Sequence, residues 1–105
     1  MTDKPIVRMW TGAVRTDDRE AYVAYIERTG MAGYRATPGN LDAWMLSRDR
    51  GDGLTEITTV SRWESMEAVT RFAGDDDPER AVFYPEDDRY LVERDERVRH
   101  YVQEA

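Results

Sequence analysis

Aromatic side chains are the residues of this sequence best suited to bind and orient a ligand. Its 105 residues include 3 Trp, 6 Tyr and 2 Phe. A small domain seldom needs so many tryptophans in its core, because each buried indole N–H requires a hydrogen-bond partner. Taken singly, each ring is more typical of a core position, but a pocket between a sheet and its helices would use several of them and would suit a flat, hydrophobic ligand. The rings considered are Trp10, Trp44, Trp63, Tyr22, Tyr34, Phe72 and Tyr84.

Few side chains could carry acid–base or metal chemistry. His100 is the sole histidine and cysteine is absent, so neither a multi-histidine metal site nor a sulfur-ligated zinc can be built within one chain. His100 lies among valines on a strand, which is more typical of a hydrogen-bonded structural histidine than of a base. Acidic neighbours such as Asp17 with Asp18, or Asp87 with Asp88, are more typical of helix ends and solvated loops than of catalytic pairs. We therefore expect no metal and no cofactor.

The composition also limits the partners. The net charge is −7, and no cluster of Lys and Arg offers the basic surface that nucleic acids or anionic membranes require. The first residues lack the features of a signal peptide, and no apolar stretch approaches the length needed to cross a bilayer. We expect a single domain over residues 1–105 in a cytoplasmic protein.

Four segments have the composition of strands, and the alternation of the first places Arg8 and Trp10 on the same face. The second and third are joined by a short link containing Gly51 and Gly53, which predicts an antiparallel hairpin. The expected strands are residues 6–14, 41–50, 54–63 and 96–103.

Two segments have the composition of helices. Asp17 followed by Glu20 resembles a capping box at the start of the first helix, which Gly30 and Gly33 should end. Ser65 can cap the second helix. An apolar patch at residues 81–84, inside the acidic connector that follows, could add a turn or two of helix.

The resulting order, β-α-β-β-α-β, predicts an α+β, ferredoxin-like domain whose four-stranded antiparallel sheet carries two helices on one face. The strands have apolar residues on both faces, and two helices cover only one. Because the second face would be too apolar to remain in water, we expect a homodimer with sheet packed against sheet.

The segment at residues 58–68, TTVSRWESMEA, resembles the antibiotic biosynthesis monooxygenase domains of the dimeric α/β-barrel superfamily. The motifs FAG at 72–74 and AVFYP at 81–85 extend the resemblance, which spans nearly the whole chain. The resemblance implies a homodimer whose two sheets form a barrel, with one pocket per subunit. Some members of that family oxidise aromatic polyketides to quinones without a cofactor, because the substrate, as an electron-rich phenolate, itself passes an electron to dioxygen.

The resemblance also implies site residues. Trp63 matches the tryptophan of the family and is the first candidate for a catalytic role. His100 or Arg8 is expected to handle the phenolate, Arg8 only because it shares a face with Trp10. Polyketide oxygenases have an Asn four residues before that tryptophan, where this chain has Thr59. The haem-degrading branch needs an Asn on the first strand and a His on the segment that follows the tryptophan. This chain has Trp10 and Thr11 on that strand and no His before His100, so haem degradation is disfavoured. The residues expected to bind substrate are Trp10, Tyr22, Tyr34, Phe72 and Tyr84.

Two functions remain open. The first is cofactor-independent monooxygenation of a small aromatic compound of polyketide or quinol type. The alternative is a non-catalytic small-molecule-binding or accessory protein that uses the same pocket. A purely structural dimer with a collapsed core is a third possibility, which the absence of a cavity beside Trp63 would favour.

Overall fold

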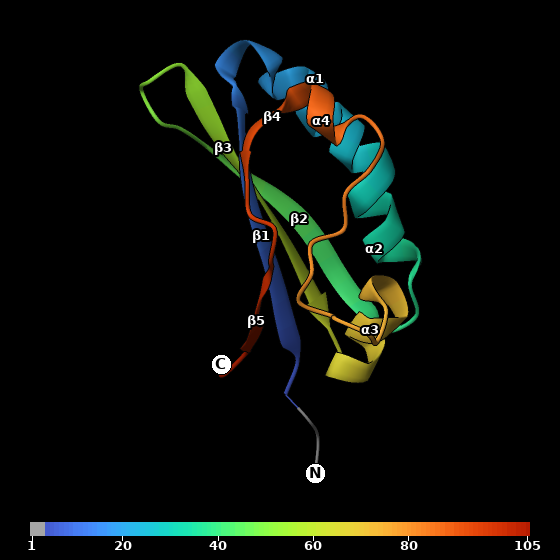
Figure 1. Ribbon diagram of the computed structural model, residues 1–105. Coiled ribbons are helices and arrows are strands. Elements are labelled where there is room, and N and C mark those ends of the chain that lie inside the picture. The colour runs from blue at the N-terminus through green and yellow to red at the C-terminus, as the bar shows by residue number, and fades with distance from the viewer. Residues whose placement is uncertain (1–3) are drawn as a thin grey trace.

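One antiparallel sheet of five strands, covered by helices on one face, forms the frame of the computed structural model, which describes residues 4–105 (Figure 1). The strands run in the order β2-β3-β1-β4, and β5 also pairs with β1. This is the predicted ferredoxin-like α+β arrangement, in which the first and third strands lie at the centre. The sheet of one chain is open, so a closed barrel stays a prediction for the dimer. The strands are β1 (Ile6–Arg15), β2 (Asn40–Asp49), β3 (Leu54–Trp63), β4 (Leu91–Arg94) and β5 (Arg99–Val102).

The predicted hairpin between the second and third strands is confirmed. β2 and β3 pair in antiparallel register from Asp49 opposite Thr55 to Asn40 opposite Trp63. Gly51 in the connecting turn has a φ of +88°, a conformation that favours glycine because it has no Cβ.

The last strand differs from the prediction of residues 96–103: β5 occupies only part of that segment, and β4, which was not predicted, precedes it. β4 and β5 both pair with β1, and between them Asp95 N–H still donates to Thr11 O of β1 at 3.0 Å. The next residues bond to the preceding connector: Ala81 N–H donates to Glu96 O at 2.9 Å, and Val98 N–H donates to Glu79 O at 2.8 Å. The backbone groups of this break are therefore satisfied by a segment that a strand pattern cannot reveal.

The first helical segment is longer than predicted. It begins with a 3₁₀ turn (Thr16–Asp18), continues as α1 (Arg19–Ile26), passes through a π-helical turn (Glu27–Met31) and ends as α2 (Ala32–Ala36).

Two local predictions for this segment are wrong. Gly30 and Gly33 do not end the helix, because they lie inside it and leave room for aromatic rings: a Cβ on Gly33 would lie 3.3 Å from the Tyr84 hydroxyl. The predicted capping box is also absent, since no side-chain hydrogen bond caps the helix at Asp18.

The second helix begins as predicted. Ser65 Oγ accepts a hydrogen bond of 3.1 Å from Ala68 N–H and caps α3 (Met66–Ala73). The apolar patch at residues 81–84 is not helical; the short helix α4 (Asp87–Tyr90) follows it. Among residues 4–105, no helix is long and apolar enough to cross a membrane.

The two faces of the sheet are covered differently. All helices lie on one side of the sheet (Figure 1), and the residues there form the core. On the opposite face, Trp44, Leu46 and Tyr101 are 41%, 52% and 47% exposed. The prediction that this second face carries large apolar side chains is therefore confirmed. We call it the open face.

Candidate functional site

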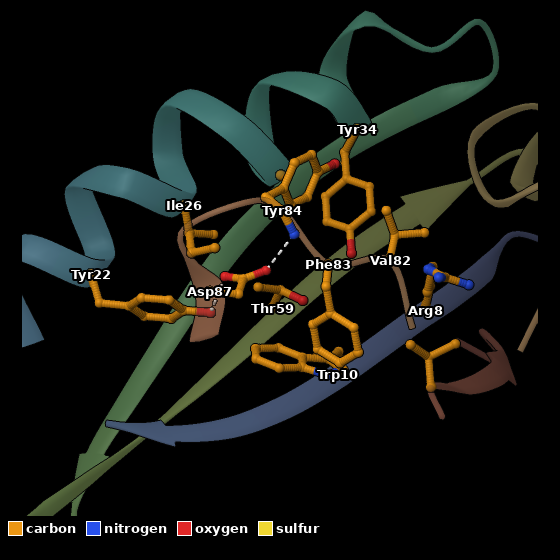
Figure 2. Close-up of a pocket in the computed structure, with 12 residues that line it drawn as sticks. Arg8, Trp10, Tyr22, Ile26, Tyr34, Thr59, Val82, Phe83, Tyr84 and Asp87 are labelled. Carbon is orange, nitrogen blue, oxygen red and sulfur yellow. Dashed lines mark hydrogen bonds between the residues drawn. The ribbon is translucent and has the colours of Figure 1, made fainter. Parts of the chain in front are cut away.

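A small cavity lies between the helical face of the sheet, the first helical segment and the connector that precedes α4 (Figure 2). Its volume is about 30 Å³, which is room for roughly one or two water molecules. We call residues 78–86 of the connector the strap, because residues 82–84 form one wall of the cavity. The lining residues are Arg8, Trp10, Tyr22, Ile26, Gly30, Tyr34, Thr59, Val82, Phe83, Tyr84, Asp87 and Val98.

Trp10 forms a fixed wall of the cavity. Its ring lies back along β1 over Gly12, where a Cβ would approach the ring to 2.5 Å, so only glycine fits at that position. The indole N–H donates to Asp95 O at 2.8 Å, in the break between β4 and β5. Phe83 meets the ring edge-on at 6.1 Å. Because its one donor is already used, Trp10 offers a ligand only an apolar surface.

Arg8 is a buried cation beside the cavity, with an exposed fraction of 1%. Its Nη1 donates to Pro78 O at 2.6 Å and Nη2 donates to Arg80 O at 3.3 Å, so it holds the start of the strap. The guanidinium also lies 5.7 Å from the centre of the Phe72 ring. Within residues 4–105 it forms no ion pair with a carboxylate, and its Nε is buried without a hydrogen-bond partner. A buried charge that only neutral dipoles compensate is unusual and costly.

His100 contacts Arg8 but does not itself line the cavity. Its Nε2 lies 3.0 Å from Arg8 Nη1. Because a guanidinium can only donate, Nε2 accepts this bond and the ring proton is on Nδ1. Nδ1 is 3.9 Å from Glu79 Oε2. Burial and the charge of Arg8 lower the pKa of His100, so the ring is neutral and orients the guanidinium.

A carboxylate, Asp87, stands on the other side of the cavity. Oδ1 accepts a hydrogen bond of 3.1 Å from the Tyr22 hydroxyl, and Oδ2 accepts one of 2.6 Å from Tyr84 N–H. Burial raises the pKa of Asp87. Burial also raises the pKa of Tyr22 and of Tyr84, and the nearby Asp87 carboxylate adds to both shifts, so both phenols stay protonated.

No feature of the sequence indicates this role for Asp87, which its pattern identifies as a helix-end or loop residue. It does begin the short helix α4, but it is also buried. An acidic residue inside the acidic run at 86–88 carries no local signal of burial, because the Tyr22 hydroxyl that it meets is 65 residues away.

Thr59 is a further polar residue of the cavity. Its hydroxyl is buried and has no hydrogen-bond partner within residues 4–105. This is the position at which the resemblance predicts an Asn in polyketide oxygenases. The position therefore does line the cavity, although its residue differs.

The structure brings most of the predicted site residues together. Trp63, Phe72 and His100 do not line the cavity, although His100 contacts Arg8. Trp63 is fully buried in the core, packs edge-on against Tyr34 at 6.0 Å, and donates its N–H to Ser61 Oγ at 2.9 Å. Phe72 packs against Tyr34 at 4.5 Å. Both rings thus support cavity residues without facing the cavity, and the catalytic role of Trp63 stays a prediction. The predicted residues that line the cavity are Arg8, Trp10, Tyr22, Tyr34 and Tyr84.

Comparison with known proteins gives structural matches only. No family model matches the sequence, and no curated protein sequence matches it. A candidate antibiotic biosynthesis monooxygenase from Bacillus cereus has a similar structure, with a TM-score of 0.69 and 19% identity over 97% of this chain and 95% of that one. A candidate of the same name from Nitrosomonas europaea gives a TM-score of 0.60 and 16% identity over 98% and 91% of the two chains.

A heme-degrading protein from Mycobacterium tuberculosis is also similar, with a TM-score of 0.54 and 17% identity over 96% of this chain and 95% of that one. The chain therefore has the fold of the antibiotic biosynthesis monooxygenase structures, as the resemblance in the sequence predicted. Because these identities are low, the likeness establishes the fold, and the chemistry has to be argued from the cavity.

Proposed function

We propose that this chain is a homodimeric member of the antibiotic biosynthesis monooxygenase family that oxidises a small aromatic compound with dioxygen and without a cofactor. The observation that carries the proposal is a cavity walled by aromatic rings that contains one buried cation without a counter-ion, Arg8. A desolvated site of this kind stabilises an electron-rich aromatic anion, the form of a substrate that gives up an electron to dioxygen most readily.

Anthrone is a simple model of the reaction. Its CH₂ group becomes C=O: one atom of dioxygen enters the product, the other leaves as water with both hydrogens, and the substrate supplies all four electrons. The protein has to exclude water, orient the ring and stabilise the oxyanion of the enol form. Arg8 and the Thr59 hydroxyl are the groups placed to donate to that oxygen, and His100 holds Arg8 in position.

The cavity has to open before such a substrate can enter. A volume of about 30 Å³ is far smaller than any aromatic ring system. Residues 82–84 of the strap and Val98 lack regular secondary structure, whereas the other lining residues belong to strands and helices. We therefore expect the strap to move outward when a ligand binds, as loops over many active sites do.

Two copies of the chain are proposed to pack through the open face. Trp44, Leu46 and Tyr101 are exposed there, and charged pairs such as Arg62 with Asp42 lie beside them. An apolar centre with a polar rim is typical of a protein–protein interface. The cytoplasmic location expected from the sequence is part of the same proposal.

A non-catalytic ligand-binding protein is the second candidate. Thr59 favours it, because a hydroxyl stands where the polyketide oxygenases have an amide. A protein of this kind would use the same cavity and the same cation, but would leave its ligand unchanged.

Oxygen uptake separates the two candidates. With anthrones and hydroquinones in metal-free buffer, at a pH alkaline enough to ionise a fraction of each, the wild-type chain is expected to consume dioxygen. Thr59→Val, which removes the hydroxyl in the cavity, should lower the rate by about tenfold or more. The matched control is Thr58→Val, since Thr58 bonds to Thr11 on the open face and should leave the rate unchanged. Tight binding without uptake would establish the second candidate.

A further inference from the structure

We infer that the ligand of the cavity is an oxyanion that is already ionised when it binds: an aromatic carboxylate, or a phenol or enol acidic enough to lose its proton in neutral water. The inference rests on the proposed function only in taking this cavity as the ligand site. It adds the substrate class, and it follows from the groups that surround Arg8.

The first step is the unused capacity of Arg8. A guanidinium has five N–H bonds. Three of them are directed at Pro78 O, Arg80 O and His100 Nε2. Nε–H and one N–H of Nη2 are left, and Nε is buried without a partner beside the cavity. An oxyanion is the ligand that best satisfies such donors, because hydrogen bonds between two ions are shorter and stronger than those to neutral groups.

The second step is that no neighbouring group is free to take a proton from a ligand at Arg8. The lone pair of His100 already accepts from Arg8, so this ring cannot act as a base there without losing that bond. Burial raises the pKa of Tyr84, and its phenol is protonated. The Thr59 hydroxyl can donate to an anion but is no base. A neutral acid would therefore have to lose its proton in solution, before it binds.

The third step is the orientation imposed by Asp87. Figure 2 shows Asp87 beside Tyr22 on one side of the lining residues and Arg8 on the other. Both carboxylate oxygens of Asp87 already accept hydrogen bonds, and Asp87 lies on the other side of the lining residues from Arg8, so it is not placed to take a proton from a group held at Arg8. Its negative charge repels an anionic group. The charged end of the ligand is thus directed to Arg8, and its neutral part toward the Tyr22 side.

The test measures equilibrium binding of matched pairs and requires no turnover. In the carboxylate arm, 2-naphthoate is compared with its neutral isostere 2-naphthamide by calorimetry. In the phenol arm, 4-nitrophenol is titrated with pH, because its anion absorbs visible light and its neutral form does not. In the first arm we expect naphthoate to bind about tenfold or more tightly than the amide. In the second we expect the pKa of nitrophenol to fall by about one unit or more on binding, which corresponds to the same tenfold preference for the anion. Either result supports the inference. The arm with the stronger preference for the anion shows whether the ligand group is a carboxylate or an ionised phenol.

Variants of Arg8 assign the preference to this residue. Arg8→Lys should retain a preference for the anion, and Arg8→Met should lose it. The matched control is Arg89→Met, since the Arg89 side chain is 71% exposed on α4 and should leave the preference intact. If Arg8→Met does not fold, the two arms on the wild-type chain still decide the matter.

Absence of a preference in both arms, including failure of both anionic probes to bind, overturns the inference. The outcome is separable from that of the proposed function. Oxygen uptake with a neutral substrate, without anion preference, removes the inference and leaves the oxygenase. Anion preference without any uptake leaves the inference and supports a binding protein.

Discussion

Replacing Trp63 distinguishes a structural role from the catalytic role that the sequence resemblance implies. Trp63 and Ser61 are both fully buried, and the indole N–H donates to Ser61 Oγ at 2.9 Å. Trp63→Phe removes this donor and leaves the serine hydroxyl unpaired in the core, which costs about 1–3 kcal/mol. The smaller ring also leaves a void, which costs about 1 kcal/mol more. We expect the free energy of unfolding to fall by about 2–4 kcal/mol.

A double-mutant cycle isolates the hydrogen bond. In a Trp63→Phe background, Ser61→Ala removes the unpaired hydroxyl, so the double variant should be about 1–2 kcal/mol more stable than the sum of the single changes predicts. Urea unfolding followed by circular dichroism gives these values, since the loss of an indole would alter a fluorescence signal. The affinity for 2-naphthoate should stay within about threefold of wild type, because Trp63 does not line the cavity.

Two results would refute this reasoning. Strict additivity of the single changes would mean that the hydrogen bond between Trp63 and Ser61 contributes nothing. A folded Trp63→Phe variant with wild-type stability but no oxygen uptake would place the indole in the reaction, as the resemblance to the monooxygenase family implies.

Three further changes test the cavity, the Arg8 pair and the open face. Gly30→Ala should raise the unfolding free energy by about 0.5–1 kcal/mol in urea melts, because a Cβ there lies 3.5 Å from the Tyr84 ring, and it should weaken naphthoate binding by filling the cavity. Because the folded chain lowers the pKa of His100 from 6.5, the unfolded chain takes up this proton first, so stability is lost as pH falls below that value. His100→Gln, which can still accept from Arg8, should show a smaller loss over the same pH range; equal losses would contradict the assignment. Leu46→Glu on the open face should halve the mass measured by sedimentation, whereas the control Met66→Glu on α3 should not.

Local sequence patterns predicted those parts of the fold that local interactions determine. The bounds of β3 follow from a run of β-branched residues between a glycine turn and a helix cap. Ser65 begins α3 because its hydroxyl meets an N–H only three residues away. The alternation of β1 placed Arg8 and Trp10 on the face that contains the cavity.

The remainder depends on contacts between distant segments. Arg8 meets the strap 70 and 72 residues away, and the strap in turn bonds to the chain between β4 and β5, which splits the last strand. Alternation also cannot distinguish Trp10 from Trp63, since both point to the helical side of the sheet. Tyr34 and Phe72 enclose Trp63, whereas the cavity is left beside Trp10, and only the packing of the helices decides this.

Arg8 uses some of its N–H donors for the protein backbone and leaves others for a ligand, and this has a kinetic consequence. The carbonyl oxygens of Pro78 and Arg80 accept hydrogen bonds from the Arg8 guanidinium at all times. An incoming anion can therefore use only the N–H donors that these carbonyls leave free. Complexes formed this way are expected to dissociate fast, with short residence times. Rapid release suits a catalyst that has to discharge product many times, and it suits a storage or carrier protein far less.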